Sequence, residues 1–469
     1  MKSEIVSSTV VRITGSCRDT DLRSRLQQYS IGSLVWEMPI IAAPPDLIPE
    51  QLVTLAARPP LSYDGQRVNV PDDLWQTLFE YQRVGVQRAV HQYRGRCLLA
   101  DDMGLGKTMQ AIAVIKHYGV SALVVCPSFL CTNWRRVLEE WQVEDVQVCS
   151  YGSVKDGPYG IVVIDEAHYL KSRDSLRTKK VLPLVLAAPY ALLLSGTPCP
   201  NRPEELFTLM HALRPSLVPC FREFAERYCN PRRTRYCPCD TRGMDRPREL
   251  KWLLDRAFQI RRMKVEVLPQ LPDKLQGILY VDIEQGSRCE LAHLQEKLEK
   301  ARKNGSRLAQ TLVMEMYRAT AHAKAQSAAA LVASKLQPGT LIFAHHHVVL
   351  DAMQQAVPTH FRVGRIDGST SVAMRQRVVD GIQDGSLDVA ILSMAAAGVG
   401  LTLTRACTAF FLEIPWCPAV LRQSEDRIHR IGQENVCTMY YVLAEGTLDT
   451  YVWRSIHRKE LVAKRIGQG

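Results

Sequence analysis

The sequence lacks the long apolar run that would anchor a protein in a membrane. Residues 1–6 show no apolar stretch of the kind that begins an export signal. The longest uncharged run, residues 181–201, approaches the ~20 residues that a transmembrane helix needs, but it contains four prolines. We interpret it as a loop that leads into a core strand. We therefore expect an intracellular protein with no membrane partner, nuclear if its source is eukaryotic or a virus that replicates in the nucleus.

The chain has fewer acidic than basic residues. No repeat or low-complexity tract stands out. The chain of 469 residues has 48 Asp and Glu against 59 Lys and Arg, a net charge of +11. This balance favours a polyanionic partner such as DNA. Residues 222–264 carry 13 Arg and Lys against 6 Asp and Glu, a local net of +7, and we expect this segment to line a DNA path. The hydrophobic content of 46% excludes wholesale disorder.

The cysteines lack the spacing of common zinc sites. Four of them lie close together: Cys220, Cys229, Cys237 and Cys239. The Cys-Pro-Cys pair does not match the usual C-x₂₋₄-C pattern, and no histidine lies within the cluster. The run of histidines at 345–347 follows an expected strand, where neighbouring side chains point to opposite faces, so we interpret it as loop. We expect reduced thiols, and the sequence leaves a zinc site at the four cysteines open.

Residues 100–108 have the composition of a phosphate-binding loop. They follow an apolar segment, 97–99, and precede residues 109–115, which resemble the first turns of a helix. Backbone N–H groups of the loop and of the helix start would bind phosphates, with loop residues Asp102, Met103, Gly104, Leu105 and Gly106. Lys107 would reach the β- and γ-phosphates of ATP, and Thr108 would ligate Mg²⁺. The general pattern has glycine where this chain has Asp101, so a plain glycine turn before a helix stays open.

Two carboxylates end an apolar segment, residues 161–165. A buried strand that ends in acids places them at the edge where α/β sheets bind ligands. Asp165 would hold Mg²⁺, directly or through water, and Glu166 would polarise the attacking water. The alternative is that the two acids cap the start of a helix.

Near the C-terminus, Arg427 and Arg430 are three residues apart. They would share one face if this segment is helical, and their guanidinium groups would stabilise charge on the transferring phosphate. Taken alone, such a pair is more often solvated or ion-paired. A further apolar strand, residues 190–194, runs into Ser195-Gly196-Thr197.

Together these segments resemble the Swi/Snf-type ATPases of helicase superfamily two over roughly residues 76–465. The resemblance implies that Gln82 reads adenine, that residues 124–127 contact DNA, and that residues 195–197 couple hydrolysis to DNA. In this family the phosphate loop tolerates a residue other than glycine at the position of Asp101. Further matches are the DEAH-type acidic box 165–168, residues 261–272, 366–370 and 393–401, and the nearly diagnostic segment 427–433.

Within this branch the chain looks most like the annealing helicases, the HepA-related subgroup. The matching segments are residues 201–206, 221–229 and 411–418, although Cys417 departs from the family's Trp-Asn-Pro. The resemblance implies fork remodelling or strand annealing on duplex or forked DNA, with little sequence preference and a role in DNA repair at replication forks. The alternatives are a chromatin remodeller, a conventional helicase and a catalytically idle DNA-binding scaffold.

The resemblance implies an α/β fold, with two RecA-like lobes whose parallel sheets are flanked by helices. The residues ahead of them predict a small N-terminal α+β module. We place the module at residues 1–75, lobe one at 76–270 and lobe two at 271–469. The module would contain strands near 10–13 and 33–38 and a helix near 47–55, and it is either a DNA-recognition module or a packing extension. Lobe two would open with a helical stretch, 291–336, broken near 304–305, and close with a helix from residue 448. We expect a monomer.

Overall fold

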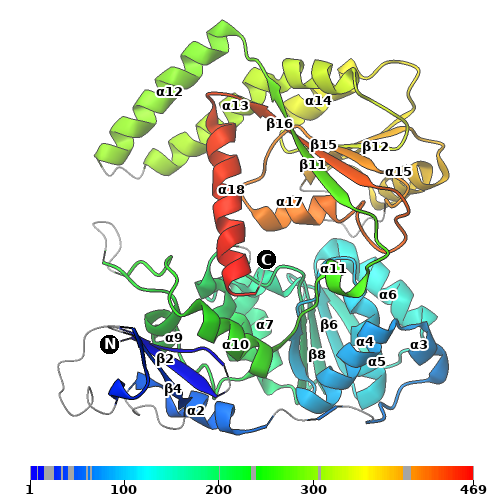
Figure 1. Ribbon diagram of the computed structural model, residues 1–469. Helices are drawn as coiled ribbons and strands as arrows, with labels where there is room; N and C mark the ends of the chain where they lie inside the picture. The colour runs from blue at the N-terminus through cyan, green and yellow to red at the C-terminus, as the bar shows by residue number, and fades with distance from the viewer. Residues whose placement is uncertain are drawn as a thin grey trace. The chain divides into compact units, whose positions relative to one another are not determined.

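The computed structural model describes residues 2–7, 9–14, 26–32, 35–40, 47–59, 62–63, 66–199, 201–233, 239–304, 308–394 and 403–467. The chain divides into two compact units. The first contains residues 1–102, 106–263 and 461–469, and the second contains residues 103–105 and 264–460. No helix within the described ranges is long and apolar enough to cross a membrane. Figure 1 shows the ribbon, coloured by residue number.

The first unit is built on a six-stranded parallel sheet (Figure 1). Its strands, in spatial order, are β10 (Gln259–Ile260), β5 (Arg96–Leu99), β9 (Tyr190–Leu194), β8 (Ile161–Asp165), β6 (Ala122–Cys126) and β7 (Val146–Ser150). The predicted strands at 97–99, 161–165 and 190–194 are therefore confirmed. Along β8, Val162 and Ile164 join one hydrophobic core, and Ile161 and Val163 join another. Both faces of the strand are buried, which explains its unbroken apolar sequence.

Helices cover both faces of this sheet. They are α3 (Asp72–Thr77), α4 (Glu80–Gln87), α5 (Lys107–Tyr118), α6 (Cys131–Glu140), α7 (Leu176–Ala187), α8 (Phe207–Leu213), α9 (Phe221–Tyr228) and α10 (Pro247–Ala257). A π-helical turn, Arg88–Gln92, continues α4. At the start of β5, the Arg96 guanidinium donates to Val185 O at 2.9 Å and to Ala212 O at 2.7 Å. It thereby satisfies carbonyls at the ends of α7 and α8, which a helix cannot bond internally.

The sequence predicts a loop over the first part of residues 181–201, and this prediction is wrong. Helix α7 continues through Pro183 to Ala187, and β9 begins at Tyr190. Proline removes one helical hydrogen bond, but its neighbours Val181, Leu184 and Val185 are buried in the core of the first unit. Burial of this apolar face outweighs the local preference of proline against helix.

The N-terminal strands form an antiparallel sheet that packs into the first unit. Its order is β1 (Lys2–Ile5), β2 (Val10–Thr14), β4 (Val35–Pro39) and β3 (Ser30–Gly32), and helix α2 (Glu50–Ala57) follows. The predicted strand at 10–13 is confirmed; of the one at 33–38, residues 33–34 lie outside the described residues and the rest is β4. Ile5, Val11 and Ile13 belong to the same core as one face of the large sheet.

A buried carboxylate joins this N-terminal sheet to α10. Glu249 has no exposed surface. It accepts hydrogen bonds from Ile5 N at 2.9 Å, Tyr228 Oη at 2.9 Å and Arg227 Nη2 at 2.8 Å. Because one acid links β1, α9 and α10, the small sheet shares both polar and apolar interior with lobe one.

The second unit contains another six-stranded parallel sheet. Its order is β11 (Lys274–Val281), β16 (Cys437–Ala444), β15 (Thr408–Phe411), β12 (Thr340–Ala344), β14 (Val389–Ser393) and β13 (Val363–Ile366). Its helices are α11 (Lys264–Val267), α12 (Gln285–Lys303), α13 (Leu308–Ala333), α14 (His347–Ala356), α15 (Val372–Asp384), α17 (Pro418–Glu425) and most of α18 (Leu448–Arg465), whose residues from 461 on belong to the first unit. Helices α12 and α13 confirm the predicted broken helical stretch, and α18 confirms the helix expected from residue 448.

A buried ion pair ties the helices of the second unit to its sheet. Lys324 Nζ lies 2.6 Å from Asp449 Oδ2 and donates to Val442 O at 2.9 Å, with both side chains almost fully buried. The predicted fold class, two helix-flanked parallel sheets with a small N-terminal module, is confirmed. The predicted limits of the three domains, at residues 75/76 and 270/271, stay predictions.

Candidate nucleotide-binding site

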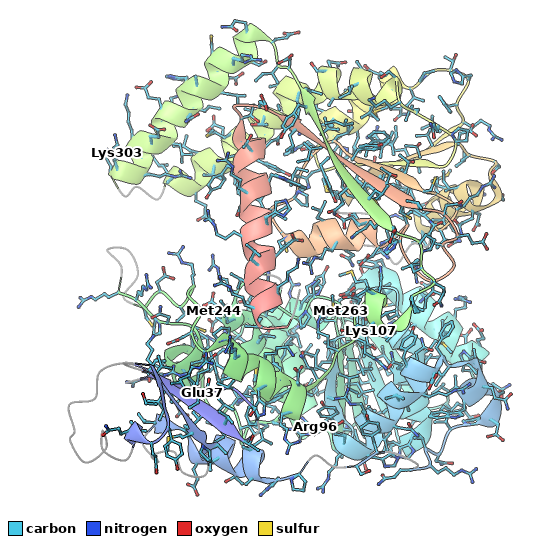
Figure 2. The ribbon with its side chains drawn as sticks, viewed as in Figure 1. Glu37, Arg96, Lys107, Met244, Met263 and Lys303 are labelled. Atoms are coloured by element: carbon cyan, nitrogen blue, oxygen red, sulfur yellow. The ribbon has the colours of Figure 1, made fainter. Side chains whose placement is uncertain are left out.

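The phosphate loop follows β5 and opens α5, as the sequence predicts. Gly104 and Gly106 have φ values of +80° and +71°, in the left-handed region that side chains rarely adopt. Lys107, labelled in Figure 2, is the first residue of α5. Its ammonium group donates to Asp101 O at 2.7 Å and to Asp102 O at 3.1 Å. Burial lowers the pKa of Lys107, and the neighbouring carboxylates, Glu166 foremost, oppose that shift.

Asp101 has a structural role that explains the departure from glycine. Its carboxylate is fully buried, accepts from Gln110 Nε2 at 2.9 Å and pairs with the guanidinium of Arg262. Arg262 also donates to Gln110 Oε1 at 2.8 Å and to the carbonyl of Tyr81, whose ring lies 5.2 Å from the guanidinium. One ionic network thus holds the loop, α5, the start of α4 and the segment after β10. Arg262 lies in the segment 261–272 that resembles the family, but the sequence did not predict its pairing with Asp101.

Gln82 lies beside the phosphate loop, where an adenine-reading residue is expected. Its side chain is buried, and its Oε1 accepts from Phe79 N at 3.0 Å at the start of α4. A Cβ added to Gly106 would collide with Gln82 Nε2. The Gln82 amide thus lies against the loop, and the positive φ of Gly106 is what favours glycine at this position.

Asp165 and Glu166 end β8 at the carboxyl edge of the same sheet. Trp134 Nε1 and Glu166 N donate to the two oxygens of Asp165, at 2.9 and 2.8 Å. Burial, and then repulsion from Glu166, raises the pKa of Asp165 to about 6. Glu166 has φ +52°, a strained value for a residue other than glycine. Glu166 stands at the N-cap position of the short 3₁₀ helix Ala167–Leu170, as the helix-cap alternative predicts, but among the described residues its side chain makes no capping hydrogen bond. The Asp165 carboxylate binds the indole of α6 instead. Trp134 was not predicted, and no sequence motif marked it.

A histidine connects the acidic pair to the Ser-Gly-Thr segment. His168 Nδ1 lies 3.2 Å from Glu166 Oε2 and 3.3 Å from Ser195 Oγ, and Thr197 N donates to Ser195 Oγ at 3.3 Å. The segment after β9 is thereby linked to the carboxylate at the end of β8. The buried hydroxyl of Thr197 has no hydrogen-bond partner among the described residues.

Arg427 and Arg430 do not lie in a helix, so the condition under which they would share one helical face is not met. Helix α17 ends at Glu425, and residues 426–432 form turns. The turns are held because Gln433 Nε2 donates to Ala406 O at 2.9 Å and Leu403 N donates to Arg427 O at 3.0 Å. Arg427 is buried, and burial lowers the pKa of Arg430. Both belong to the second unit, whereas Lys107, Thr108, Asp165 and Glu166 belong to the first.

Most of the remaining candidate residues have structural partners. In the basic segment 222–264, ion pairs join Arg222 to Glu226, Arg227 to Glu249, Arg242 to Asp240, Arg246 to Asp245 and Lys251 to Asp255. In the second unit, backbone N–H groups of His345 and His346 and the His346 ring bind Glu413, whose pKa stays below its usual value although burial opposes this.

Two groups of sequence candidates fall partly outside the described residues. Cys237 and residues 395–401 are not described, while Cys220, Cys229 and Cys239 are free thiols. Within the described part of the chain, no group of three or more His, Cys, Asp or Glu is arranged to hold a metal ion.

Comparison with known families agrees with this geometry. The family described as SNF2-related domain matches residues 81–160 and 153–328, more than half of the chain. The chain belongs to the SNF2-related family. The family described as helicase conserved C-terminal domain matches residues 323–432 of this SNF2-related chain.

Named relatives of the SNF2-related chain are longer proteins. It is 36% identical over 433 residues to the SWI/SNF-related matrix-associated actin-dependent regulator of chromatin subfamily A-like protein 1 of Xenopus tropicalis, covering 85% of this chain and 46% of that protein. It is 37% identical to the human DNA annealing helicase and endonuclease ZRANB3, covering 84% of this chain and 40% of that protein. The chain thus spans less than half the length of these relatives.

Among solved structures, the chain matches the Sulfolobus solfataricus SWI2/SNF2 ATPase core in complex with dsDNA. The match has a TM-score of 0.41 and 21% identity, and it covers 86% of this chain and 98% of that one.

Proposed function

We propose that the protein hydrolyses ATP in dependence on DNA and uses this reaction to move along DNA. The observation that carries the proposal is the convergence of Lys107, Asp165 and Glu166 at one edge of the first sheet, where burial lowers the pKa of the lysine and these carboxylates oppose the shift. This arrangement suits a nucleotide triphosphate, and the SNF2-related family match supports it.

The site suits Mg²⁺ as well as nucleotide. Burial, and then repulsion from Glu166, raises the pKa of Asp165, and a divalent cation would relieve this repulsion. Thr108 and Asp165 would hold the ion through oxygen, the donor that Mg²⁺ prefers. When bound, the ion would neutralise phosphate charge. Lys107 would leave the carbonyls of Asp101 and Asp102 for the phosphates.

Glu166 is proposed to polarise the attacking water. Its contact with His168 would orient the carboxylate and connect it to Ser195. Arg427 and Arg430 would supply positive charge to the transferring phosphate once the two units close on nucleotide. Gln82 would bind the adenine edge, and the backbone of residues 102–106 would bind the phosphates.

Fork remodelling or strand annealing is the proposed outcome of this movement. Relatives at 36–38% identity include proteins named as DNA annealing helicases. The net charge of +11 suits phosphate contacts without base readout, so we expect little sequence preference. We propose that the protein acts as a monomer, and in the nucleus if its source is eukaryotic.

The first test is ATP hydrolysis with and without duplex, single-stranded and forked DNA. We expect hydrolysis to rise with DNA, and Glu166→Gln to lower kcat by about 10²–10⁴ while ATP still binds, because the water loses its base. Lys107→Ala should weaken ATP binding itself, whereas Lys116→Ala on the same helix serves as control. Vigorous hydrolysis by Glu166→Gln would exclude its role as base.

The second test separates annealing from unwinding. We expect ATP-dependent rewinding of a bubble held open by single-strand-binding protein, with no displacement of a long strand. The affinity for DNA should fall with salt, with a slope of about −0.9 per phosphate contact. Displacement without rewinding would point to a conventional helicase instead, and a flat salt titration would contradict phosphate tracking.

A further inference from the structure

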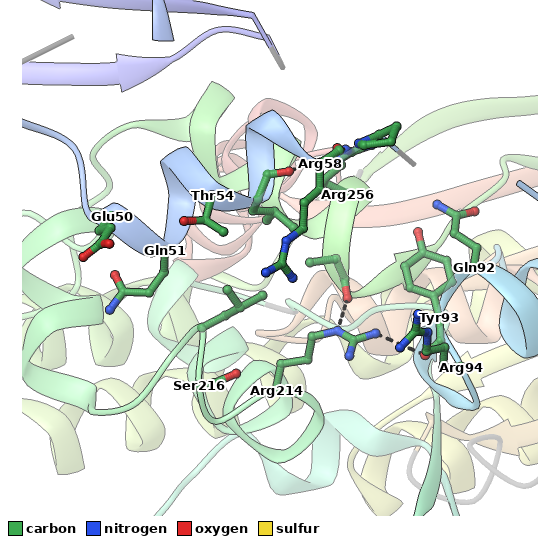
Figure 3. Close-up of a pocket in the computed structure, with 14 residues that line it drawn as sticks. Glu50, Gln51, Thr54, Arg58, Gln92, Tyr93, Arg94, Arg214, Ser216 and Arg256 are labelled. Atoms are coloured by element: carbon green, nitrogen blue, oxygen red, sulfur yellow. Dashed lines mark hydrogen bonds between the residues drawn. The ribbon is translucent and has the colours of Figure 1, made fainter. Parts of the chain in front are cut away.

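A basic cavity lies in the first unit between α2 and the large sheet. Its volume is about 680 Å³, within the range of small-molecule sites. Its walls come from α2 and the residues after it, from the turn before β5, from the loop after α8 and from the end of α10 (Figure 3). Four arginines and one glutamate line it, a formal net charge of +3: Arg58, Arg94, Arg214, Arg256 and Glu50.

Two of these arginines are fixed in place by backbone carbonyls. Arg214 donates through Nε to Ala257 O at 2.8 Å and through Nη2 to Tyr93 O at 3.1 Å. Arg256 donates to the carbonyl of Arg58, which follows α2. Burial lowers the pKa of Arg214, and the charge of Arg94 adds to this shift. The positive charge of Arg214 is therefore held at the cavity at an electrostatic cost.

The other two arginines are not held in place by backbone carbonyls in this way. Across the described ranges, neither the Arg58 nor the Arg94 side chain makes a hydrogen bond or an ion pair. Arg94 has φ +53°, in the left-handed region that favours glycine. The Arg94 guanidinium group thus stands on a strained backbone beside a cavity whose other arginines repel it. An anion bound in the cavity would relieve this repulsion.

The cavity is separate from the phosphate loop. Arg94 precedes β5 and Ala257 precedes β10, so the cavity lies at the amino ends of these strands. The phosphate loop follows the carboxyl end of β5, at the opposite edge of the sheet. Figure 2 shows Arg96 and Lys107 toward these two edges.

The lining selects the class of ligand. Guanidinium groups bind phosphate oxygens in bidentate fashion. The one aromatic ring of the lining, Tyr93, is 1% exposed, and its hydroxyl donates to Asp255 O and Gln259 O. It offers no open face on which a base would stack, as single-stranded nucleic acid sites require.

We propose that this cavity is a second anion site, which binds the multiply charged phosphate portion of a small molecule and thereby ties α2 to lobe one. Arg58 and Arg94 contact the anion from opposite walls, and Arg214 and Arg256 supply charge between them. The site does not depend on the proposed ATPase activity.

The test uses the full chain with Lys107→Ala, which weakens the phosphate loop as a competing site, and pyrophosphate as the probe in magnesium-free buffer. Titration calorimetry should show one saturable site. Arg94→Gln and Arg58→Gln should each weaken binding by roughly tenfold or more, because each removes a charge-assisted hydrogen bond. The control is Arg67→Gln, an exposed arginine of the same unit outside the cavity, which should bind like the parent.

Amide hydrogen exchange gives a second readout on the same proteins. Pyrophosphate should slow exchange in α2 of the Arg67→Gln chain and leave it unchanged in the Arg94→Gln chain. If ADP competes with pyrophosphate for the Arg94-dependent site, the phosphates belong to a nucleotide. If ADP does not compete, the ligand is a polyphosphate without a base. Both results retain the proposal.

Three results would overturn it: no saturable binding of pyrophosphate, equal binding by the Arg94→Gln and Arg67→Gln chains, or Arg94-dependent binding of a short single-stranded oligonucleotide without pyrophosphate binding. The last would make the cavity part of a nucleic-acid surface.

Discussion

Asp101 stands where the general phosphate-loop pattern has glycine, and its carboxylate is fully buried. The bidentate contact with Arg262 and the bond from Gln110 satisfy the charge inside the protein. A single residue thus connects the phosphate loop to the segment after β10. The loop's shape depends on this ionic network in addition to its glycines.

We predict that Asp101→Gly destabilises the protein, although it restores the general pattern. Arg262 would keep a buried charge without its partner, at a cost of about 3 kcal/mol in the free energy of unfolding. Urea denaturation measures the change. Combining Asp101→Gly with Arg262→Met should recover part of the loss, since both charges are then gone. Unchanged stability in Asp101→Gly would show that the network is not required.

The raised pKa of Asp165, about 6, makes stability depend on pH. Its unfolded value is near 3.8, so between these values the folded state binds more protons than the unfolded state. Stability therefore falls as pH rises from about 4 to about 6, and the full cost is present at neutral pH.

We predict that Asp165→Asn increases the free energy of unfolding of the nucleotide-free protein at pH 7.5 by about 1–3 kcal/mol. Its melting temperature should therefore rise. The gain should shrink toward pH 4.5, where the wild-type carboxyl is protonated. Thermal unfolding across this range measures it, with the exposed Asp156→Asn as control. A gain that is constant with pH would contradict the raised pKa. The variant should also lose magnesium-dependent nucleotide binding.

At the scale of elements, α7 shows packing overriding local preference. Pro183 lies inside the helix with an exposed side chain, while Val181, Leu184 and Val185 on the same helix are buried. The helix forms because its apolar face reaches the core, and it forms with one hydrogen bond fewer than its length allows.

We predict that Pro183→Ala stabilises the protein by about 1–2 kcal/mol, because it restores the helical hydrogen bond at a modest cost in chain entropy of the unfolded state. The melting temperature gives the readout, and Lys180→Ala, on the same helix, controls for the loss of an exposed side chain. A lower melting temperature in Pro183→Ala would mean that the proline ring makes packing contacts that outweigh the missing bond.

At the scale of the molecule, the N-terminal sheet cannot be treated as a detachable module. Ile5, Val11 and Ile13 share the core of lobe one, and Glu249 accepts a hydrogen bond from Ile5 N inside it. The sequence left two roles open for residues 1–75, a DNA-recognition module and a packing extension. The shared interior supports packing, while DNA recognition by this region stays a prediction.

We predict that deletion of residues 1–70 lowers the melting temperature of the first unit and reduces DNA-stimulated ATP hydrolysis together with fork activity. Removal would expose apolar core residues and leave Glu249 without one of its donors. The control is Arg12→Ala, which breaks the Arg12–Glu37 pair of the small sheet and leaves Glu249 untouched. Loss of fork activity alone, with hydrolysis and stability preserved, would favour a separable recognition module.

The sequence by itself determined the elements whose signal is local. The phosphate loop and the acid-ended strand follow from apolar runs, loop glycines and the spacing of charged residues. The two parallel sheets were expected from the resemblance to the Swi/Snf-type ATPases, which rests on those same segments. Tertiary structure alone decided the rest: the helix through Pro183, the turns at Arg427 and Arg430, and the partners of Asp101, Asp165 and Glu249. These depend on contacts between residues far apart in the chain, such as Trp134 with Asp165 and Arg262 with Asp101, and no local pattern specifies which distant residue fills a buried site.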